Sequence, residues 1–324
     1  MDDAEMNRTA RQVSFSHESK PNLGWGAGFL AVAVCFGASG CSSRQEKFST
    51  PEDAARALVV AVRSENSEGI RKILGRGSEE IVSSGDEVAD RRTRDRFLKA
   101  YDEKNELVTE LDGSMSLQVG KDDWPLPIPI VEHGSCWHFD TRRAKDEILN
   151  RRIGANELSV MQVCQALVDA QREYVAIDRN GDGVPEYAQK LLSDPGQENG
   201  LYWDTREDEP LSPMGPMVSE AAAEGYTGAK AESGERRPYH GYYFKLLKGQ
   251  GPHAPGGARD YVVNGRMTEG FAVVAWPAQY GNSGIMTFLV SHHGIVYERD
   301  LGRRTERTAS SMSTFDPDSG WDVE

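Results

Sequence analysis

Oxygen-bearing side chains alternate in the stretch DRNGDGVPE, which spans residues 178–186. Their spacing matches the first half of an EF-hand calcium loop, in which carboxylate, amide and carbonyl oxygens surround the ion. Gly183 stands where such a loop turns sharply, but Gln189 replaces the acidic residue that closes it. The spacing therefore predicts a weak calcium site of the kind found in extracellular modules. Its candidate ligands are Asp178, Asn180, Asp182, Val184 through its backbone carbonyl, and Glu186.

The same stretch has a second interpretation that needs no metal. A long amphipathic pattern leads into it, so the chain must turn here after a helix. Asp, Asn and Gly form such turns through hydrogen bonds between their side chains and nearby backbone amides. At the level of sequence, a calcium site and a metal-free turn both remain open.

The stretch HGSCWHF, residues 133–139, places a thiol between two imidazoles. Alternate residues of a strand face the same way, so Cys136 and His138 can meet. Such a pair could act as a nucleophile with its base or contribute to a metal site. No oxyanion hole or orienting acid accompanies it, so we favour a structural role and assign no catalytic residue. In an oxidising compartment Cys136 could form a disulfide with Cys164, although Cys164 falls on an apolar helix face and suits the core.

Two further groups of aromatic and imidazole side chains carry weaker signals. The stretch YHGYYF, residues 239–244, could stack on a sugar, but a strand with one face in the core explains it as well. His292 and His293 precede Gly294 in a predicted turn, where solvated side chains are expected. The chain contains no Gly-x-Ser-x-Gly or His-Glu-x-x-His motif. These observations favour a binding protein over an enzyme.

The N-terminal residues have the features of an export signal. Residues 23–40 are apolar, follow Lys20, and are fewer than the ~20 residues that span a bilayer. Ala38-Ser39-Gly40-Cys41 resembles a bacterial lipobox, in which the cysteine sulfur receives the lipid. We therefore expect a signal peptide over residues 1–40 and a lipid on Cys41. The alternatives are a plain signal peptide and an uncleaved anchor.

The net charge of the chain limits the classes of partner that it can bind. The 324-residue chain has a net charge of −14. Residues 1–40 contain three basic and four acidic residues, so the mature chain carries −14 + 1 = −13. Nucleic acid is therefore excluded as a partner, because phosphate binding needs a basic surface. We expect the lipid to hold the protein on the periplasmic face of the outer membrane or at the cell surface, where an envelope protein or glycan would be its partner.

Hydrophobic periodicity divides the mature chain into two parts after a lipidated linker over residues 41–48. Residues 49–140 predict helices followed by a curved antiparallel sheet, with Asp112-Gly113 as a hairpin turn, on a plan like that of cystatins or nuclear transport factor 2. Residues 141–324 predict helices and then an antiparallel meander. We expect the first helix of this part to end at Gly154 and Asn156 to cap the next.

Seven motifs distributed over the mature chain carry a family resemblance. They are RRIGANELSVMQVCQALVDAQREY, DRNGDGVPEYAQ, GLYW, SPMGPM, YHGYYFKLL, GGARDYVVNGRMTEGFAVVAWPAQYG and GIMTFLVSHHGIVYERDLG. Over roughly residues 48–324 the chain resembles a bacterial family known as domain of unknown function 2950. This resemblance implies an exported protein without an established reaction. The second part is also loosely similar to the soluble heads of type IV pilins and pseudopilins. It lacks their prepilin-peptidase site and the apolar helix that leads into the head.

The sequence as a whole predicts an α+β protein: N-terminal helices with a curved antiparallel sheet, then a long helix packed on an antiparallel sheet. We expect a lipid-anchored module of the cell envelope that binds or assembles without chemistry of its own. One alternative is an envelope hydrolase acting on peptidoglycan or polysaccharide, which a cleft joining His138 or His240 to an acid would favour. Another is a small-molecule sensor with a pocket in the first part.

Overall fold

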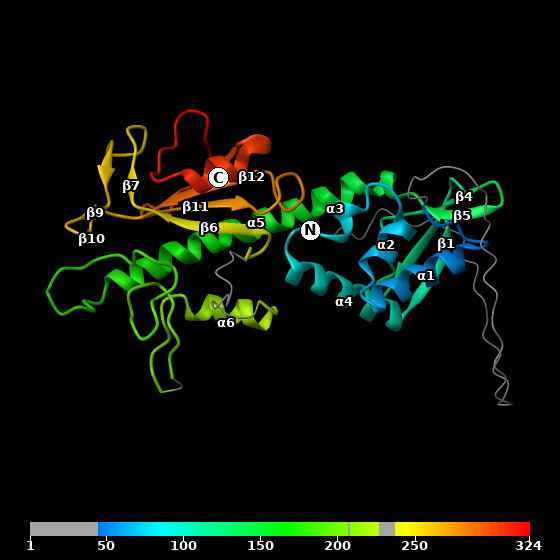
Figure 1. Ribbon diagram of the computed structural model, residues 1–324, viewed down its shortest axis with the longest axis horizontal. Coiled ribbons are helices and arrows are strands. Elements are labelled where there is room, and N and C mark those ends of the chain that lie inside the picture. The colour runs from blue at the N-terminus through cyan, green and yellow to red at the C-terminus, as the bar shows by residue number, and fades with distance from the viewer. Residues whose placement is uncertain (1–44, 207, 227–236) are drawn as a thin grey trace. The chain divides into compact units, whose positions relative to one another are not determined.

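The computed structural model describes residues 45–206, 208–226 and 237–324 (Figure 1). The predicted signal peptide over residues 1–40, and Cys41 as the lipidated residue, lie outside this part. The chain divides into two compact units. The first contains the described residues up to Val82 together with Arg91–Ile148, and the second contains Ser83–Asp90 and the described residues from Leu149 to Glu324. The predicted α+β class is confirmed, because helices accompany sheets whose strands all pair antiparallel.

Short helices begin the first unit. The Thr50 side chain accepts a hydrogen bond from the Asp53 amide at 3.1 Å, and Pro51 occupies the first helical position, so the first helix begins with a side-chain cap. Asn66 caps the next helix by accepting from the Gly69 amide, and that helix ends at Gly75. The helices are α1 (Pro51–Arg63), α2 (Ser67–Leu74), α3 (Glu79–Val82) and α4 (Glu87–Glu103), of which α4 belongs to the first unit from Arg91 onward.

The sheet of the first unit has the order β1-β2-β4-β5, and β3 pairs with β2. The predicted Asp112-Gly113 hairpin joins β1 to β2: Gly113 has a φ of 82°, and the Asp112 carboxylate accepts from the Ser114 amide at 3.0 Å. Apolar residues of α1, α2 and the inner sheet face form one core. The strands are β1 (Asn105–Thr109), β2 (Met115–Val119), β3 (Trp124–Pro125), β4 (Ile130–His133) and β5 (Cys136–Phe139).

A single helix, α5 (Thr141–Val175), replaces the two helices predicted from the sequence. The expectations that Gly154 ends a helix and that Asn156 caps the next are therefore wrong. Burial of Ile153 and Val160 outweighs the cost of about 1 kcal/mol for an interior glycine. Asn156 instead donates from Nδ2 to the Ser283 carbonyl at 2.8 Å. No helix among the described residues is both long and apolar enough to cross a membrane.

In the second unit an antiparallel sheet with the order β14-β13-β12-β11-β6 is covered by helices on both faces (Figure 1). Every residue of β11 is buried, as expected for such a strand. The main strands are β6 (Tyr242–Leu247), β11 (Ala272–Pro277), β12 (Met286–Ser291), β13 (Val296–Asp300) and β14 (Asp322–Val323). Shorter elements are α6 (Gly215–Ala223), β7 (Gly249–Gln250), β8 (Arg259–Asp260), β9 (Val262–Val263), β10 (Arg266–Met267), η1 (Gly302–Arg304) and α7 (Thr305–Ser311).

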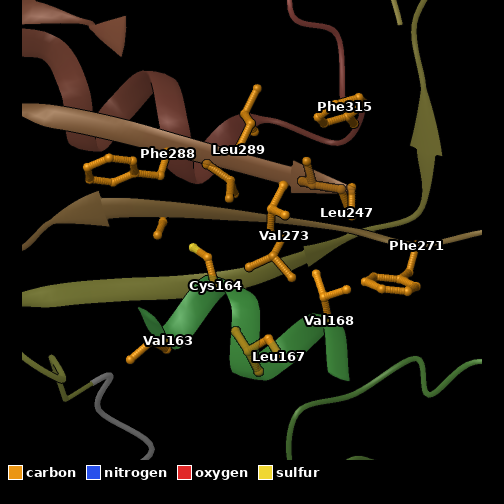
Figure 2. Packing of buried hydrophobic residues seen from close by; sticks show 14 of the residues in the cluster. Val163, Cys164, Leu167, Val168, Leu247, Phe271, Val273, Phe288, Leu289 and Phe315 are labelled. Carbon is orange, nitrogen blue, oxygen red and sulfur yellow. The ribbon is translucent and has the colours of Figure 1, made fainter. Parts of the chain in front are cut away.

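The apolar face of α5 packs on this sheet, which confirms the predicted helix-on-sheet arrangement. Figure 2 shows α5 residues beneath the strands, with Cys164 next to the side chains that the strands contribute. Burial of these apolar side chains stabilises the unit by roughly 25 cal/mol for each Å² of apolar surface removed from water. The labelled helix residues are Val163, Cys164, Leu167 and Val168, all buried.

Polar residues of α5 also fix the loop between β11 and β12. Arg152 donates to the Asn282 side-chain oxygen at 2.5 Å. The Glu157 carboxylate accepts from the amides of Ile285 at 2.8 Å and Met286 at 2.9 Å. The Tyr242 hydroxyl shares its proton between this oxygen at 3.3 Å and the Met286 carbonyl at 3.0 Å, and burial, reinforced by the carboxylate, raises the pKa of Tyr242. One carboxylate thus serves two backbone amides and one phenol.

The stretch YHGYYF is a turn followed by a strand, not one continuous strand. Tyr239 and Tyr242 exchange backbone hydrogen bonds at 2.8 and 3.1 Å. His240 and Gly241 between them have φ of 49° and 74°, the pattern of a type I′ hairpin turn. The alternation predicted for residues 239–241 is therefore wrong, and β6 begins at Tyr242.

We predict that Glu157→Ala lowers the free energy of unfolding of the second unit by about 2–4 kcal/mol, because two amides lose their acceptor. Glu157→Gln keeps an oxygen acceptor and should cost only about 1 kcal/mol. Urea denaturation of both variants, with hydrogen exchange at Ile285 and Met286, measures the difference. Equal losses in the two variants would contradict the role given to this oxygen.

Candidate functional site

The predicted calcium loop follows the end of α5 and is a chain of side-chain-to-backbone turns. Asp178 accepts from the amides of Gly181 at 2.8 Å and Gly183 at 2.7 Å. Asn180 accepts from the Asp182 amide at 3.2 Å, and Asp182 accepts from the Val184 amide at 3.0 Å. These bonds are the ones expected of a metal-free turn.

Side chains outside the turn complete its connections. The Asn180 amide donates to the Glu186 carboxylate at 3.0 Å. Arg266 of β10 contacts the second carboxylate oxygen of Asp182, so a cation at this position would have to displace a guanidinium. Across the described ranges, no group of three or more His, Cys, Asp or Glu side chains is placed to hold a metal ion. Calcium binding here stays a prediction.

An arginine in the same loop anchors it to the second unit. The Arg179 guanidinium lies 4.2 Å from the centre of the Tyr174 ring and 5.3 Å from that of Trp203. It also lies 3.8 Å from the Glu198 carboxylate, and its side chain is only 14% exposed. These contacts hold the loop against Tyr174, Trp203 and Glu198.

The predicted grouping of Cys136 with two histidines is present on β4 and β5. The register pairs His133 with Cys136, and His138 follows two residues later, so the three share one sheet face. The imidazole rings of His133 and His138 are 6.5 Å apart. Burial, followed by the charge of His133, lowers the pKa of His138, which favours its neutral form. This cluster has a base but no carboxylate that orients it.

The two described cysteines are free thiols in different units, so the structure does not contain the disulfide considered from the sequence. Cys136 is half-buried at the start of β5, with the Ser135 hydroxyl 4.0 Å from its sulfur. Cys164 is fully buried on α5, and this burial raises its pKa to about 12. Its environment is that of a core residue.

A hollow of about 490 Å³ in the second unit was not predicted from the sequence. The end of β11 and the turn that follows it form one wall, and η1 and α7 form the other. A volume of this size is typical of small-molecule sites. Its lining residues are Pro277, Ala278, Gln279, Tyr280, Gly281, Arg303 and Glu306.

Hydrogen bonds hold the walls of the hollow in place. The Gln279 carbonyl accepts from the Ser283 amide at 2.9 Å, and its side-chain oxygen accepts from Asn282 at 2.8 Å. The Tyr280 hydroxyl donates to the Asp300 carboxylate at 3.1 Å, and burial, followed by this contact, raises the pKa of Tyr280. The other Asp300 oxygen accepts from the Gly302 amide at 2.7 Å. The site is thus formed before any ligand arrives.

The hollow presents three kinds of recognition group. Arg303 and Glu306 are exposed, and the side chain of neither forms a hydrogen bond or ion pair with another residue in the described part of the chain. The Tyr280 side chain is 36% exposed and offers one side of an aromatic ring. A guanidinium donates, a carboxylate accepts, and an aromatic face packs against C–H groups. Together they suit a ligand that carries many hydroxyls, such as a sugar.

A second group of titratable residues in this unit surrounds the buried carboxylate of Asp86. That carboxylate accepts from the Tyr226 hydroxyl at 2.8 Å and from the Gly241 amide at 3.0 Å. Burial is the largest cause of the raised pKa of Tyr226, and the Asp86 charge adds to it. His240 lies 3.6 Å from the Glu224 carboxylate, so one of the histidines considered from the sequence does meet an acid.

Of the remaining pair, His292 and His293, only one histidine is solvated as expected for the turn. His293 is exposed, but His292 is half-buried, with its ring 5.7 Å from Tyr261 and 6.3 Å from Phe271. Burial is the largest cause of the lowered pKa of His292. His292 is half-buried because it packs against aromatic residues that are distant in the sequence. The residues of the turn alone could not predict these contacts.

Comparison with known proteins identifies one family. A family model described as "Protein of unknown function (DUF2950)" matches residues 45–323. This match covers almost all of the described residues and agrees with the resemblance carried by the sequence motifs. No curated protein and no solved structure matches the chain. The looser likeness to pilin heads therefore has no support from a solved structure.

We predict that iodoacetamide alkylates Cys136 but not Cys164 in the native protein at pH 8, because Cys136 is only half-buried whereas Cys164 is fully buried and its pKa is raised by that burial. In guanidinium chloride both should react. Mass spectrometry of the two peptides measures this. Rapid native labelling of Cys164 would show that the core around α5 is not closed.

We predict that Arg266→Ala enlarges any rise in melting temperature caused by calcium, because it leaves the Asp182 carboxylate open to the ion. A site with Kd of ~0.1–1 mM contributes about 0.4–1.4 kcal/mol at 1 mM calcium. Asp182→Asn is the control that removes the charge. Melting curves with calcium and with chelator that coincide for wild type and Arg266→Ala would exclude the site.

Proposed function

We propose that this chain, which belongs to the DUF2950 family, is a lipid-anchored protein of the bacterial cell envelope that binds an envelope glycan. The hollow lined by Tyr280, Arg303 and Glu306 carries the proposal, because its charged groups are available and its walls are held by the fold. Binding without chemistry fits these residues, since none of them forms a nucleophile–base pair.

The proposed anchor rests on the lipobox-like residues before Cys41 and on the position where the folded part starts. The Gln45 amide donates to the carbonyls of Ile73 at 3.1 Å, Leu74 at 3.0 Å and Phe139 at 2.6 Å. The chain is therefore fixed to the first unit at Gln45, four residues after Cys41. This arrangement suits an ectodomain held close to a lipid on the periplasmic face of the outer membrane or at the cell surface.

The chemistry of the hollow favours a glycan over the other partners considered. Sugars present hydroxyls that both donate and accept, which a guanidinium and a carboxylate satisfy together, and C–H faces that pack on tyrosine. A nucleic acid is disfavoured by the net charge of −14. An envelope protein that presents a similar mixture of groups is the remaining partner class.

The second candidate function is an envelope hydrolase, and the approach of His240 to Glu224 favours it. A histidine beside a carboxylate can act as a general base on water. Asp86 adds a buried charge that holds Tyr226 and the turn before β6 in place. Loss of glycan cleavage in His240→Ala, with binding retained, would place chemistry at this second cluster.

We predict that Arg303→Ala and Glu306→Ala each weaken binding to peptidoglycan sacculi or to envelope polysaccharide by about 10- to 100-fold, because each removes a charged hydrogen bond. Arg304→Ala and Arg307→Ala are matched controls, since both residues are exposed neighbours that do not line the hollow. Sedimentation with sacculi and titration with soluble polysaccharide measure binding. No binding by wild type to either ligand, together with no crosslinked partner in the native envelope, would contradict the proposal.

A further inference from the structure

We propose that the first unit binds the phosphate of an anionic phospholipid headgroup in a hollow beside Gln45. This inference rests on the lipid anchor of the proposed function and extends it to how the anchored protein faces its membrane. The hollow has a volume of about 260 Å³ and lies at the C-terminal end of α2. It is separate from the glycan site, which belongs to the other unit.

The hollow has a positive balance of charge in an acidic protein. Three basic and two acidic side chains line it, for a net charge of 3 − 2 = +1, against −14 for the whole chain. The basic residues are Arg71, Lys72 and Arg76, and the acidic residues are Glu68 and Glu79. Phosphate groups in proteins are bound mainly by arginine and lysine side chains, so the excess of these residues around the hollow indicates a site that suits phosphate.

One ion pair already orders part of this hollow. Lys72 lies 2.8 Å from Glu68, and the hydrogen bond to Glu68 is the main cause of its raised pKa. Lys72 therefore stays protonated at neutral pH. Lys72 and Glu68 are both exposed at the surface, where an ion pair contributes little to the stability of the fold and exchanges partners readily. A phosphate can share this ammonium group without a large loss.

The length of the tether places the hollow near the headgroups. Only residues 42–44 separate the lipidated Cys41 from Gln45, and four extended residues reach at most about 14 Å. The headgroup region of a bilayer is itself several Å deep on each side. Because the Gln45 side chain is bonded to three carbonyls of the first unit and also lines the hollow, the hollow remains within this reach.

The tether also decides between the sources of phosphate. An anchored protein meets its own membrane at a high effective concentration, whereas free phosphate must bind from solution. Each basic residue near an anionic membrane surface strengthens association by about fivefold at low salt. Two arginines and one lysine are enough to orient a tethered protein, although its overall charge is negative.

The test uses the acylated protein, purified and reconstituted into vesicles of phosphatidylcholine alone or of phosphatidylcholine with phosphatidylglycerol. An amine-reactive reagent labels exposed lysines, and mass spectrometry compares Lys72 with Lys121, an exposed lysine of the same unit. We expect labelling of Lys72, relative to Lys121, to fall about fivefold in the anionic vesicles and to recover in 0.5 M salt.

The double variant Arg71→Ala/Arg76→Ala should lose this protection. The matched control Arg91→Ala/Arg96→Ala removes two exposed arginines of α4 and should keep it. Circular dichroism confirms that both variants fold. Equal Lys72 labelling in the two kinds of vesicle overturns the headgroup contact, and so does protection caused by inorganic phosphate without anionic lipid.

A separate measurement tests whether the protein carries the lipid anchor. The mass of the N-terminal peptide shows whether Cys41 carries a lipid. An unmodified Cys41 overturns the lipid anchor and this inference with it. An acylated protein whose Lys72 is not protected overturns only the headgroup contact and leaves the anchor in place.

Discussion

The second unit depends on one carboxylate of its long helix. Glu157 accepts from two consecutive backbone amides at the start of β12 and from the phenol at the start of β6. Burial of apolar surface stabilises the contact between α5 and the sheet, but the hydrophobic effect itself has no direction. Hydrogen bonds to a fixed oxygen do have direction, so they set the position of α5 against both strands. The loop that Glu157 holds also forms one wall of the hollow that contains Tyr280, so the hollow takes its shape partly from α5.

Features that depend on neighbouring residues could be predicted from the sequence. The cap at Thr50, the hairpin at Asp112-Gly113 and the turn after α5 all follow from side chains within a few positions of the backbone that they serve. Features that depend on distant residues could not. Gly154 stays helical because Ile153 and Val160 are buried by other segments, and the hollow needs η1 and α7 to approach the end of β11. Local propensity contains no information about either contact.

The oxygens of the acidic loop illustrate a general ambiguity in motifs. Asp178, Asn180 and Asp182 were predicted either to coordinate calcium or to close a turn, and in the structure their oxygens accept from backbone amides. Calcium loops use many of the same bonds to shape themselves, so the two uses have one sequence pattern. The local pattern also contains no sign of Arg266, which comes from a strand more than 80 positions later and meets Asp182 only after folding.

The attachment of Gln45 has a consequence for the order of events in the exported, lipid-anchored protein that we propose. Its side-chain amide donates to the Phe139 carbonyl, 94 positions later in the chain. In a chain exported from its N-terminus this contact would form only after Phe139 had followed, because non-local contacts form late. The first unit would therefore stay incomplete at Gln45 while the proposed processing upstream took place, and completion of the fold would close that interval.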